Sequence, residues 1–262
     1  MTYQTLEFRI EDHVAIITFN RPDAANGIDL TLAQELMAAA IVCEDNNDIR
    51  AVLLTGNGKM FSAGGDLKSF AEFGEQTSAK IKELMVYMHS AIARFARMDA
   101  PLIVAVNGTA AGAGFSMACA GDIVYAAQSA KFTMAYTAAG LSPDGSASYF
   151  LPRLVGLRRA QELMFTNRLL SADEAKDWGI LTDVVANENL FETALTQAKK
   201  LAAGPTLAYG SVKKLLMSSS QESLETQLEL EAKGMGAMTK TNDGLEGIQA
   251  FCEKRRPSFS GQ

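Results

Sequence analysis

Two stretches of small residues have the composition and spacing to hold a negatively charged oxygen. The first, residues 107–114 (Asn-Gly-Thr-Ala-Ala-Gly-Ala-Gly), lies between an apolar run at 101–106 and a segment at 115–120 whose composition favours a short buried helix. Because Gly112 and Gly114 carry no side chains, another backbone or a ligand can approach the amides between them. The first amides of a helix have no intrahelical partner and lie at its positive end. This loop is therefore suited to binding an anionic or polarised oxygen.

The second stretch is residues 61–68 (Phe-Ser-Ala-Gly-Gly-Asp-Leu-Lys), which follows an apolar run at 50–55 and the turn at 56–58. It repeats the order of strand, small residues and exposed amides, and Asp66 is placed to cap a following helix. Taken alone, either stretch is equally compatible with a plain strand-to-helix connection. If the two loops converge, their amides can hold one carbonyl oxygen between them, which is an oxyanion hole.

Asp144 is the carboxylate that can act beside such a hole. It lies where a loop gives way to the helical pattern of residues 149–155. One interpretation is an N-cap that accepts hydrogen bonds from the amides of Ser146 or Ala147. The other is a carboxylate over an apolar pocket, with a pKa raised by desolvation, that moves a proton.

Two competing motifs fail on spacing. A dinucleotide-binding fingerprint would need a glycine where Met117 stands. Ser116 has a glycine two residues before it, but the hydrolase triad needs its histidine after the serine, and both histidines precede it. We expect His13 to be solvated in a polar turn. His89 lies in a helix expected over Thr77–Arg97, either on a half-buried face or in a functional position.

The composition indicates a protein with a substantial core. The chain has 262 residues, 48% of them hydrophobic and 21% charged, which fits one large domain or a core with an appendage. The net charge of -6 argues against nonspecific binding to nucleic acid or to an anionic membrane. Three scattered cysteines and two distant histidines indicate neither a disulfide framework nor a metal site. No signal-peptide pattern or membrane-spanning run is visible, so we expect a cytoplasmic protein.

The order of patterns along the chain indicates an α/β fold. We expect strands at 6–10, Val14–Phe19, 50–55, 101–106, 122–126 and 131–134, and helices at 31–45 and Thr77–Arg97. From residue 157 onward the pattern is mostly helical, with a last strand at 180–186. We divide the chain into a catalytic core, 1–200, and a helical C-terminal oligomerisation region, 201–262.

The two small-residue stretches, together with the segments at 20–22 (Asn-Arg-Pro) and 253–259 (Glu-Lys-Arg-Arg-Pro-Ser-Phe), resemble the crotonase family, or enoyl-CoA hydratase/isomerase superfamily. The resemblance runs nearly end to end. It implies a ClpP-like spiral of ββα units with a C-terminal helical trimerisation region, assembled as a homotrimer or as a hexamer of two trimers. It also implies an acyl-CoA thioester as substrate, so that coenzyme A is carried as part of the substrate and no separate cofactor is needed.

The resemblance also assigns site residues. It implies that the thioester oxygen is held by the backbone amides of Gly65 and Ala113, which would stabilise an enolate more than the substrate. Tyr136 would form a wall of the acyl pocket. The resemblance also implies that coenzyme A contacts Ala24, Ser62, Ala63 and Leu67 of the same subunit, and Phe251 and Lys254 of a neighbouring subunit.

The acids around the hole distinguish the reactions of this family. Its hydratases use two glutamates, and the corresponding positions here hold Ser116 and Tyr136, so hydration is not favoured. Asp144 matches the single acid of the family's isomerases. This chain most resembles the ring-epoxide-CoA isomerases of phenylacetate metabolism, and 3-enoyl-CoA to 2-enoyl-CoA isomerases fit equally. We therefore predict double-bond or ring isomerisation with Asp144 as the single acid and base.

Two alternatives stay open. The resemblance extends to 4-chlorobenzoyl-CoA dehalogenases, in which Asp144 would be the nucleophile and His89 the base of a hydrolytic reaction. Of the aromatic walls expected in that case, Tyr136 is present, whereas Gly65 and Met88 replace the others. The second alternative is a non-catalytic relative that binds acyl-CoA or RNA, and the acidic net charge disfavours RNA.

Overall fold

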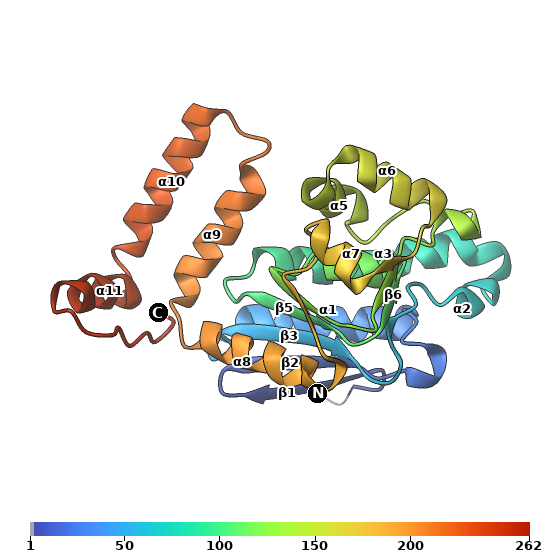
Figure 1. Cartoon of the computed structure of the whole chain (residues 1–262), viewed down its shortest axis with the longest axis horizontal. Helices are drawn as coiled ribbons and strands as arrows, with labels where there is room; N and C mark the ends of the chain where they lie inside the picture. The colour runs from blue at the N-terminus through green and yellow to red at the C-terminus, as the bar shows by residue number, and fades with distance from the viewer. Residues whose placement is uncertain (1–2) are drawn as a thin grey trace.

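The computed structural model describes residues 3–262, which contain a six-stranded central sheet and a second, four-stranded sheet (Figure 1). The strand order of the central sheet is β1 (Leu6–Glu11), β2 (Val14–Phe19), β3 (Ala51–Gly56), β5 (Leu102–Val106), β7 (Ile123–Ala127) and β10 (Asp183–Val185). The β1–β2 hairpin is antiparallel, and the other neighbours in this sheet are parallel. The α/β fold predicted from the apolar runs is confirmed.

The second sheet is built from short strands that alternate along the chain with strands of the central sheet, which gives a spiral of repeating units. Its strands are β4 (Met60–Ser62), β6 (Thr109–Ala111), β8 (Lys131–Thr133) and β9 (Leu170–Ser171). A long strand of the central sheet is followed by a short strand here and then by a helix, as in β3, β4 and α2, and again in β5, β6 and α4. These are the predicted ββα units. Three of the short strands, β4, β6 and β9, were not expected, because two or three residues carry no readable periodicity.

Helices cover the central sheet because its inner strands are apolar on both faces. Strands β3 and β5 are buried almost throughout, which is typical of parallel strands. Helices α1 (Leu30–Asp45) and α3 (Thr77–Arg97) pack on each other, and α8 (Leu190–Ala202) contacts β2, β3, β5 and β7. The buried face of α1 includes Leu32, Leu36, Ala39 and Ala40, at the spacing of one side of a helix.

The remaining helices are short in the core and longer near the C-terminus. Their bounds are α2 (Leu67–Ala71), α4 (Ala113–Cys119), α5 (Ala147–Val155), α6 (Leu157–Thr166), α7 (Ala172–Asp177), α9 (Thr206–Ser218), α10 (Leu224–Met238) and α11 (Asn242–Cys252). Single 3-10 turns occupy Pro22–Ala24, Gly74–Gln76, Thr137–Ala139 and Asn187–Asn189. Over residues 3–262, no helix is both long enough and apolar enough to cross a membrane.

Helices α9–α11, which we call the C-terminal arm, project away from the sheets (Figure 1). Two buried cations attach the arm to the core. Lys213 on α9 contacts Asp122 at 2.7 Å and donates to Phe95 O at 2.7 Å. Arg50, just before β3, donates to Thr206 Oγ1 at the start of α9 at 3.3 Å and to the preceding Gly204 O at 2.7 Å. The division into a core of residues 1–200 and an oligomerisation region remains a prediction.

Candidate active site

The two small-residue loops meet in space although they are far apart in sequence. A Cβ atom on Gly64 would lie 2.8 Å from Ala111 O and 3.1 Å from the amide nitrogen of Ala113, so these backbones are in contact. Gly112 has φ 51° and ψ -125°, a conformation that side chains disfavour. A Cβ atom on Gly114 would lie 2.6 Å from Ser62 O. The absence of side chains at these glycines allows the close approach.

The amides of Gly65 and Ala113 are both free at this junction. Gly65 forms a parallel bridge with Ile28, in which Ile28 donates to Gly64 O and Asp66 donates to Ile28 O. The amide of Gly65 itself therefore points away from Ile28. Ala113 is the first residue of α4, where amides have no intrahelical acceptor. Among the described residues, neither amide has a hydrogen-bond acceptor, and both residues line the same cavity.

This front cavity has a volume of about 160 Å³ and mostly apolar walls. Its polar side chains are those of Asp144, Tyr136 and Ser142. The apolar walls come from the loop after β1–β2, from α2 and α3, and from the turn before Asp144, and include Ile28, Leu67, Phe70, Ile81, Leu84, Met85, Met88 and Leu141. The few polar groups of this cavity are thus surrounded by mostly apolar walls, as is typical of small-molecule sites.

The Asp144 carboxylate is held by Tyr136. The Tyr136 hydroxyl donates to Asp144 Oδ1 at 2.7 Å and lies 2.9 Å from Ser116 Oγ. Burial, and then the negative charge of Asp144, raise the pKa of Tyr136 far above its ordinary value, so this hydroxyl keeps its proton. The N-cap interpretation of Asp144 is wrong. Ser146 is the N-cap residue of α5, without a side-chain cap, and Ala147 donates to the backbone oxygen of Asp144, not to its carboxylate.

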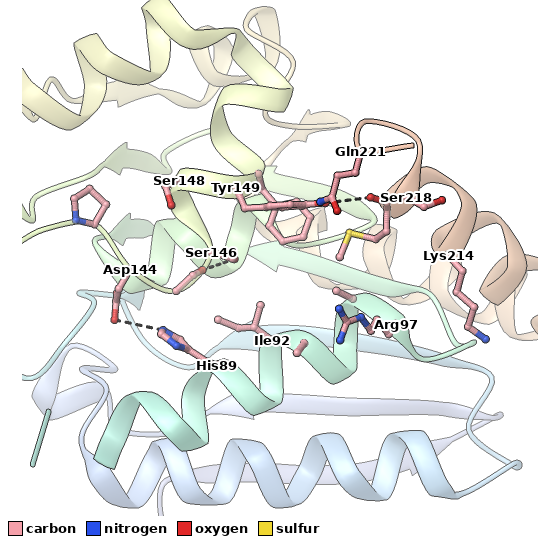
Figure 2. A pocket seen from close by; sticks show the side chains of 16 residues that line it. His89, Ile92, Arg97, Asp144, Ser146, Ser148, Tyr149, Lys214, Ser218 and Gln221 are labelled. Carbon is pink, nitrogen blue, oxygen red and sulfur yellow. Dashed lines mark hydrogen bonds and ion pairs between the residues drawn. The ribbon is translucent and has the colours of Figure 1, made fainter. Parts of the chain in front are cut away.

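His89 approaches Asp144 from the other side. Its Nε2 atom lies 3.9 Å from Asp144 Oδ2, and half of its side chain is exposed. Figure 2 shows both side chains at one end of a rear cavity of about 930 Å³, between α3, α5 and α9. Asp144 lines both cavities, whereas His89 lines the rear cavity and not the front one.

The residues implied for coenzyme A are divided in the structure. Ala63 and Leu67 line the front cavity beside Gly65, and Ala24 is exposed on the nearby 3-10 turn. The side chain of Ser62 is fully buried, because its hydroxyl donates to Asn26 O at 2.8 Å and accepts from the amide of Gly64. Ser62 thus shapes the loop with its side chain and has no exposed surface for a ligand contact, so the predicted contact to coenzyme A is not supported at this residue.

Phe251 and Lys254 lie elsewhere. Phe251 is 83% exposed near the end of α11, and Lys254 follows this helix, on the far side of the molecule from α2 (Figure 1). The chain does not bring either residue to its own front cavity. Their assignment to the site of a neighbouring subunit remains a prediction.

Arg21 is a residue of this region that the sequence reasoning did not single out. Its guanidinium lies 3.0 Å from the carboxylates of both Asp29 and Asp66 and donates to Gly27 O. Burial alone would raise the pKa of Asp66, but hydrogen bonds from the Ser69 amide and Arg21 outweigh it and lower the pKa. The Asn-Arg-Pro segment was the sequence signal that could have identified this residue. Its arginine connects the loop at residues 27–29 to Asp66, next to the Gly64–Gly65 corner.

Comparison with known proteins decides the family. Residues 9–262 match the family model described as enoyl-CoA hydratase/isomerase. The chain belongs to this family. It is 38% identical to the 1,2-epoxyphenylacetyl-CoA isomerase of Escherichia coli K12 over 97% of both chains, and 37% identical to 4-chlorobenzoyl coenzyme A dehalogenase-2 of Arthrobacter sp over 94% of this chain and 90% of that one. The crystal structure of the enoyl-CoA hydratase from Bacillus anthracis superposes with a TM-score of 0.92 at 34% identity, covering 99% of this chain and 100% of that one.

Relatives of this enoyl-CoA hydratase/isomerase family protein thus carry three different activity names. The family membership predicted from the small-residue loops is confirmed, and so is the crotonase spiral. The reaction has to be argued from the side chains around the front cavity. Over residues 3–262, no group of three or more His, Cys, Asp or Glu side chains is arranged to hold a metal ion.

Proposed function

We propose that this enzyme isomerises a double bond or a ring in a coenzyme A thioester through an enolate, with Asp144 as its single acid and base. The observation that carries the proposal is the placing of Asp144. It is the one carboxylate among the described residues that line the front cavity, and the free amides of Gly65 and Ala113 belong to the same cavity.

The chemistry needs one base and one oxyanion site. Asp144 takes a proton from a carbon activated by the thioester, and the negative charge moves to the thioester oxygen. Two amide donors on that oxygen stabilise the enolate more than the substrate, and each is worth about 3–4 kcal/mol in other enzymes. The same carboxylate then returns a proton to a different carbon of the enolate. The apolar walls keep competing water away during this interval.

Hydration is disfavoured by the same side chains. Adding water to a double bond needs one group to activate the water and another to protonate carbon. The Tyr136 hydroxyl stays protonated and donates a hydrogen bond to Asp144, so it is not available as a base. Ser116 is a neutral hydroxyl that is fully buried beside Tyr136.

A specific observation favours aryl-CoA dehalogenation as a second candidate. His89 Nε2 lies 3.9 Å from Asp144 Oδ2, and Arthrobacter dehalogenases are among the relatives. In that reaction Asp144 would attack the ring carbon and displace halide, and water activated by His89 would hydrolyse the resulting ester. We rank this second because Gly65 and Met88 supply no aromatic wall. A non-catalytic acyl-CoA-binding role is the third candidate.

The substrate and assembly follow from the family as further proposals. We propose an acyl-CoA thioester that brings its own coenzyme A, so that no separate cofactor takes part. We also propose a homotrimer or a hexamer of two trimers, in which Phe251 and Lys254 of one subunit meet the nucleotide end of coenzyme A bound to the next. A lysine facing a phosphate makes a charge-assisted contact.

The variant Asp144→Asn tests the isomerase proposal. Wild-type protein and the variant are incubated with a panel of 2-enoyl-, 3-enoyl-, aryl- and haloaryl-CoA thioesters, and products are identified by mass and retention time. Loss of the general base lowers isomerisation by roughly 10²–10⁴-fold while binding persists. Asp12→Asn is the matched control, because Asp12 is 71% exposed in a surface turn. Full turnover by Asp144→Asn would remove Asp144 from the mechanism, and halide release without isomerisation would establish the second candidate.

A further inference from the structure

The Asp144 carboxylate lies between two cavities of very different size. The front cavity has a volume of about 160 Å³ and the rear cavity one of about 930 Å³. Polar and charged side chains line part of the rear wall (Figure 2). Among the described residues, Asp144 is the one that lines both. Besides Asp144 and His89, the polar side chains of the rear wall are those of Arg97, Ser146, Ser148, Tyr149, Lys214, Ser218 and Gln221. One side of the carboxylate therefore faces the small front cavity, and the other faces a large space with polar groups to which water can bind.

The two carboxylate oxygens have different neighbours. Oδ1 accepts from Tyr136, which lines the front cavity. Oδ2 faces His89, which lines the rear cavity, across 3.9 Å. This separation is too long for a direct hydrogen bond. A small rotation of the half-exposed imidazole, or one bridging water, closes it. His89 is thus placed to exchange a proton with Asp144 from the solvent side.

We propose that His89 exchanges the proton on Asp144 with water in the rear cavity while the enolate is bound in the front cavity. This inference rests on the proposed function. The C–H bond at the α-carbon breaks, its proton forms an O–H bond on Asp144, and its electron pair enters the enolate. Asp144 passes that proton to His89 Nε2, which hands it to water and delivers a solvent proton in return. The reverse step then forms a C–H bond with hydrogen from the solvent.

A substrate that cannot isomerise isolates this exchange. Butanoyl-CoA has no double bond, and in D₂O its α-carbon takes up deuterium only when an enolate forms and the base exchanges with solvent. Uptake is followed by mass spectrometry. We expect wild-type protein to label butanoyl-CoA, and His89→Leu to do so at least about tenfold more slowly, since proton relays by side chains contribute rate factors of this order or more.

The chain supplies a matched control and a second variant. His13 is its other histidine, in the β1–β2 turn with Nδ1 3.0 Å from Asp48 O, and His13→Leu is expected to label at the wild-type rate. Ala93 lies one helical turn beyond His89 and also lines the rear cavity. Ala93→Trp keeps His89 but fills that cavity, so labelling is expected to slow in this variant as well, even if His89→Leu folds poorly.

The outcomes separate the two proposals. Labelling abolished by Asp144→Asn and slowed by both His89→Leu and Ala93→Trp establishes the exchange route. Labelling abolished by Asp144→Asn but unchanged in both folded rear-cavity variants overturns this inference and leaves the isomerase proposal intact. Labelling that survives Asp144→Asn overturns the proposed function itself, because the α-proton then moves without the carboxylate.

Discussion

Glycines of the core and of the C-terminal arm can have opposite surroundings. In the core, Gly64 and Gly114 lie where one backbone contacts another, so even a methyl group would collide with main-chain oxygen. In the arm, Gly210 and Gly244 are similarly confined, but a Cβ atom on Gly236 of α10 would meet no atom within 4 Å. Gly64 and Gly114 thus allow a geometry that no other residue provides, whereas Gly236 only weakens its helix.

Burial differs in the same direction. Strands β3 and β5 of the core bury nearly every side chain, but α10 has no buried residue. The arm leaves large apolar side chains more than half exposed, namely Val212, Leu216, Leu224, Leu228, Met235, Leu245, Ile248 and Phe251. The geometry of the core is fixed by its own packing. The arm instead depends on a few polar attachments and on whatever covers its apolar side chains, which fits the proposed oligomer.

The sharpest test of this contrast is a methyl group placed in each region. Gly64→Ala puts a side chain at φ 88° and 2.8 Å from Ala111 O, so the corner must shift. We expect turnover to fall by about 10²-fold or more, as when an oxyanion donor is lost, and stability to fall by about 1–3 kcal/mol. Gly236→Ala is expected to stabilise α10 by up to about 1 kcal/mol with activity retained. Turnover and thermal unfolding measure both, and an active Gly64→Ala enzyme would contradict the contrast.

The attachment of the arm is tested by two neighbouring lysines. Lys213→Met removes a buried partner of Asp122 and leaves that carboxylate without its cation, which is expected to lower the free energy of unfolding by about 3–5 kcal/mol. Lys214→Met breaks an ion pair with Asp99 in which the lysine is 59% exposed, and a loss below about 1 kcal/mol is expected. Urea unfolding compares the two variants. Equal losses would mean that α9 is not held at Lys213.

The smallest effect is a pH dependence confined to the arm. Hydrogen bonds from Arg255, then from the Ser258 amide, lower the pKa of Glu246 to about 2. Because the folded pKa lies below the ordinary 4.5, the stabilising contribution is complete above that value and is lost as the pH falls toward 2. Hydrogen exchange of α11 is therefore expected to accelerate over this range beyond its intrinsic pH dependence.

The control for this pH effect is a glutamate on the neighbouring helix. Glu246→Gln should remove the acceleration, whereas Glu229→Gln, at an exposed pair with Lys233, should leave it unchanged. An acceleration that persists in Glu246→Gln would place its origin outside the contact with Arg255.

Much of the core was predictable because its signals are local. The period of the apolar residues in Thr77–Arg97 gave α3 with its observed bounds. Ser171 and Glu174 form the capping box that their spacing indicates, and Asp66 caps α2. The two glycine corners were recognised as a pair because each repeats strand, small residues and exposed amides. Their contact in the structure follows from glycines that were visible in the sequence.

The site's polar network was not predictable in the same way. The hydroxyl of Tyr136 meets the carboxylate of Asp144 only after β8 and the turn before α5 have folded over α4, and no spacing encodes that contact. For the same reason the local pattern suggested an N-cap at Asp144, which the tertiary contact replaces. The short strands β4, β6 and β9 were missed because their pairing partners, and not their own residues, define them.

The two amides at Gly65 and Ala113 belong to the main chain, so any residue except proline at these positions retains an N–H group. As long as the backbone of this corner is preserved, the proposed contacts to a thioester oxygen do not depend on the identity of the reacting side chains. The residues at 89, 116, 136 and 144 lie around the proposed reaction centre, and their side chains can be replaced without removing those amides. New reactions can then arise by substitution at these few positions while the fold stays unchanged.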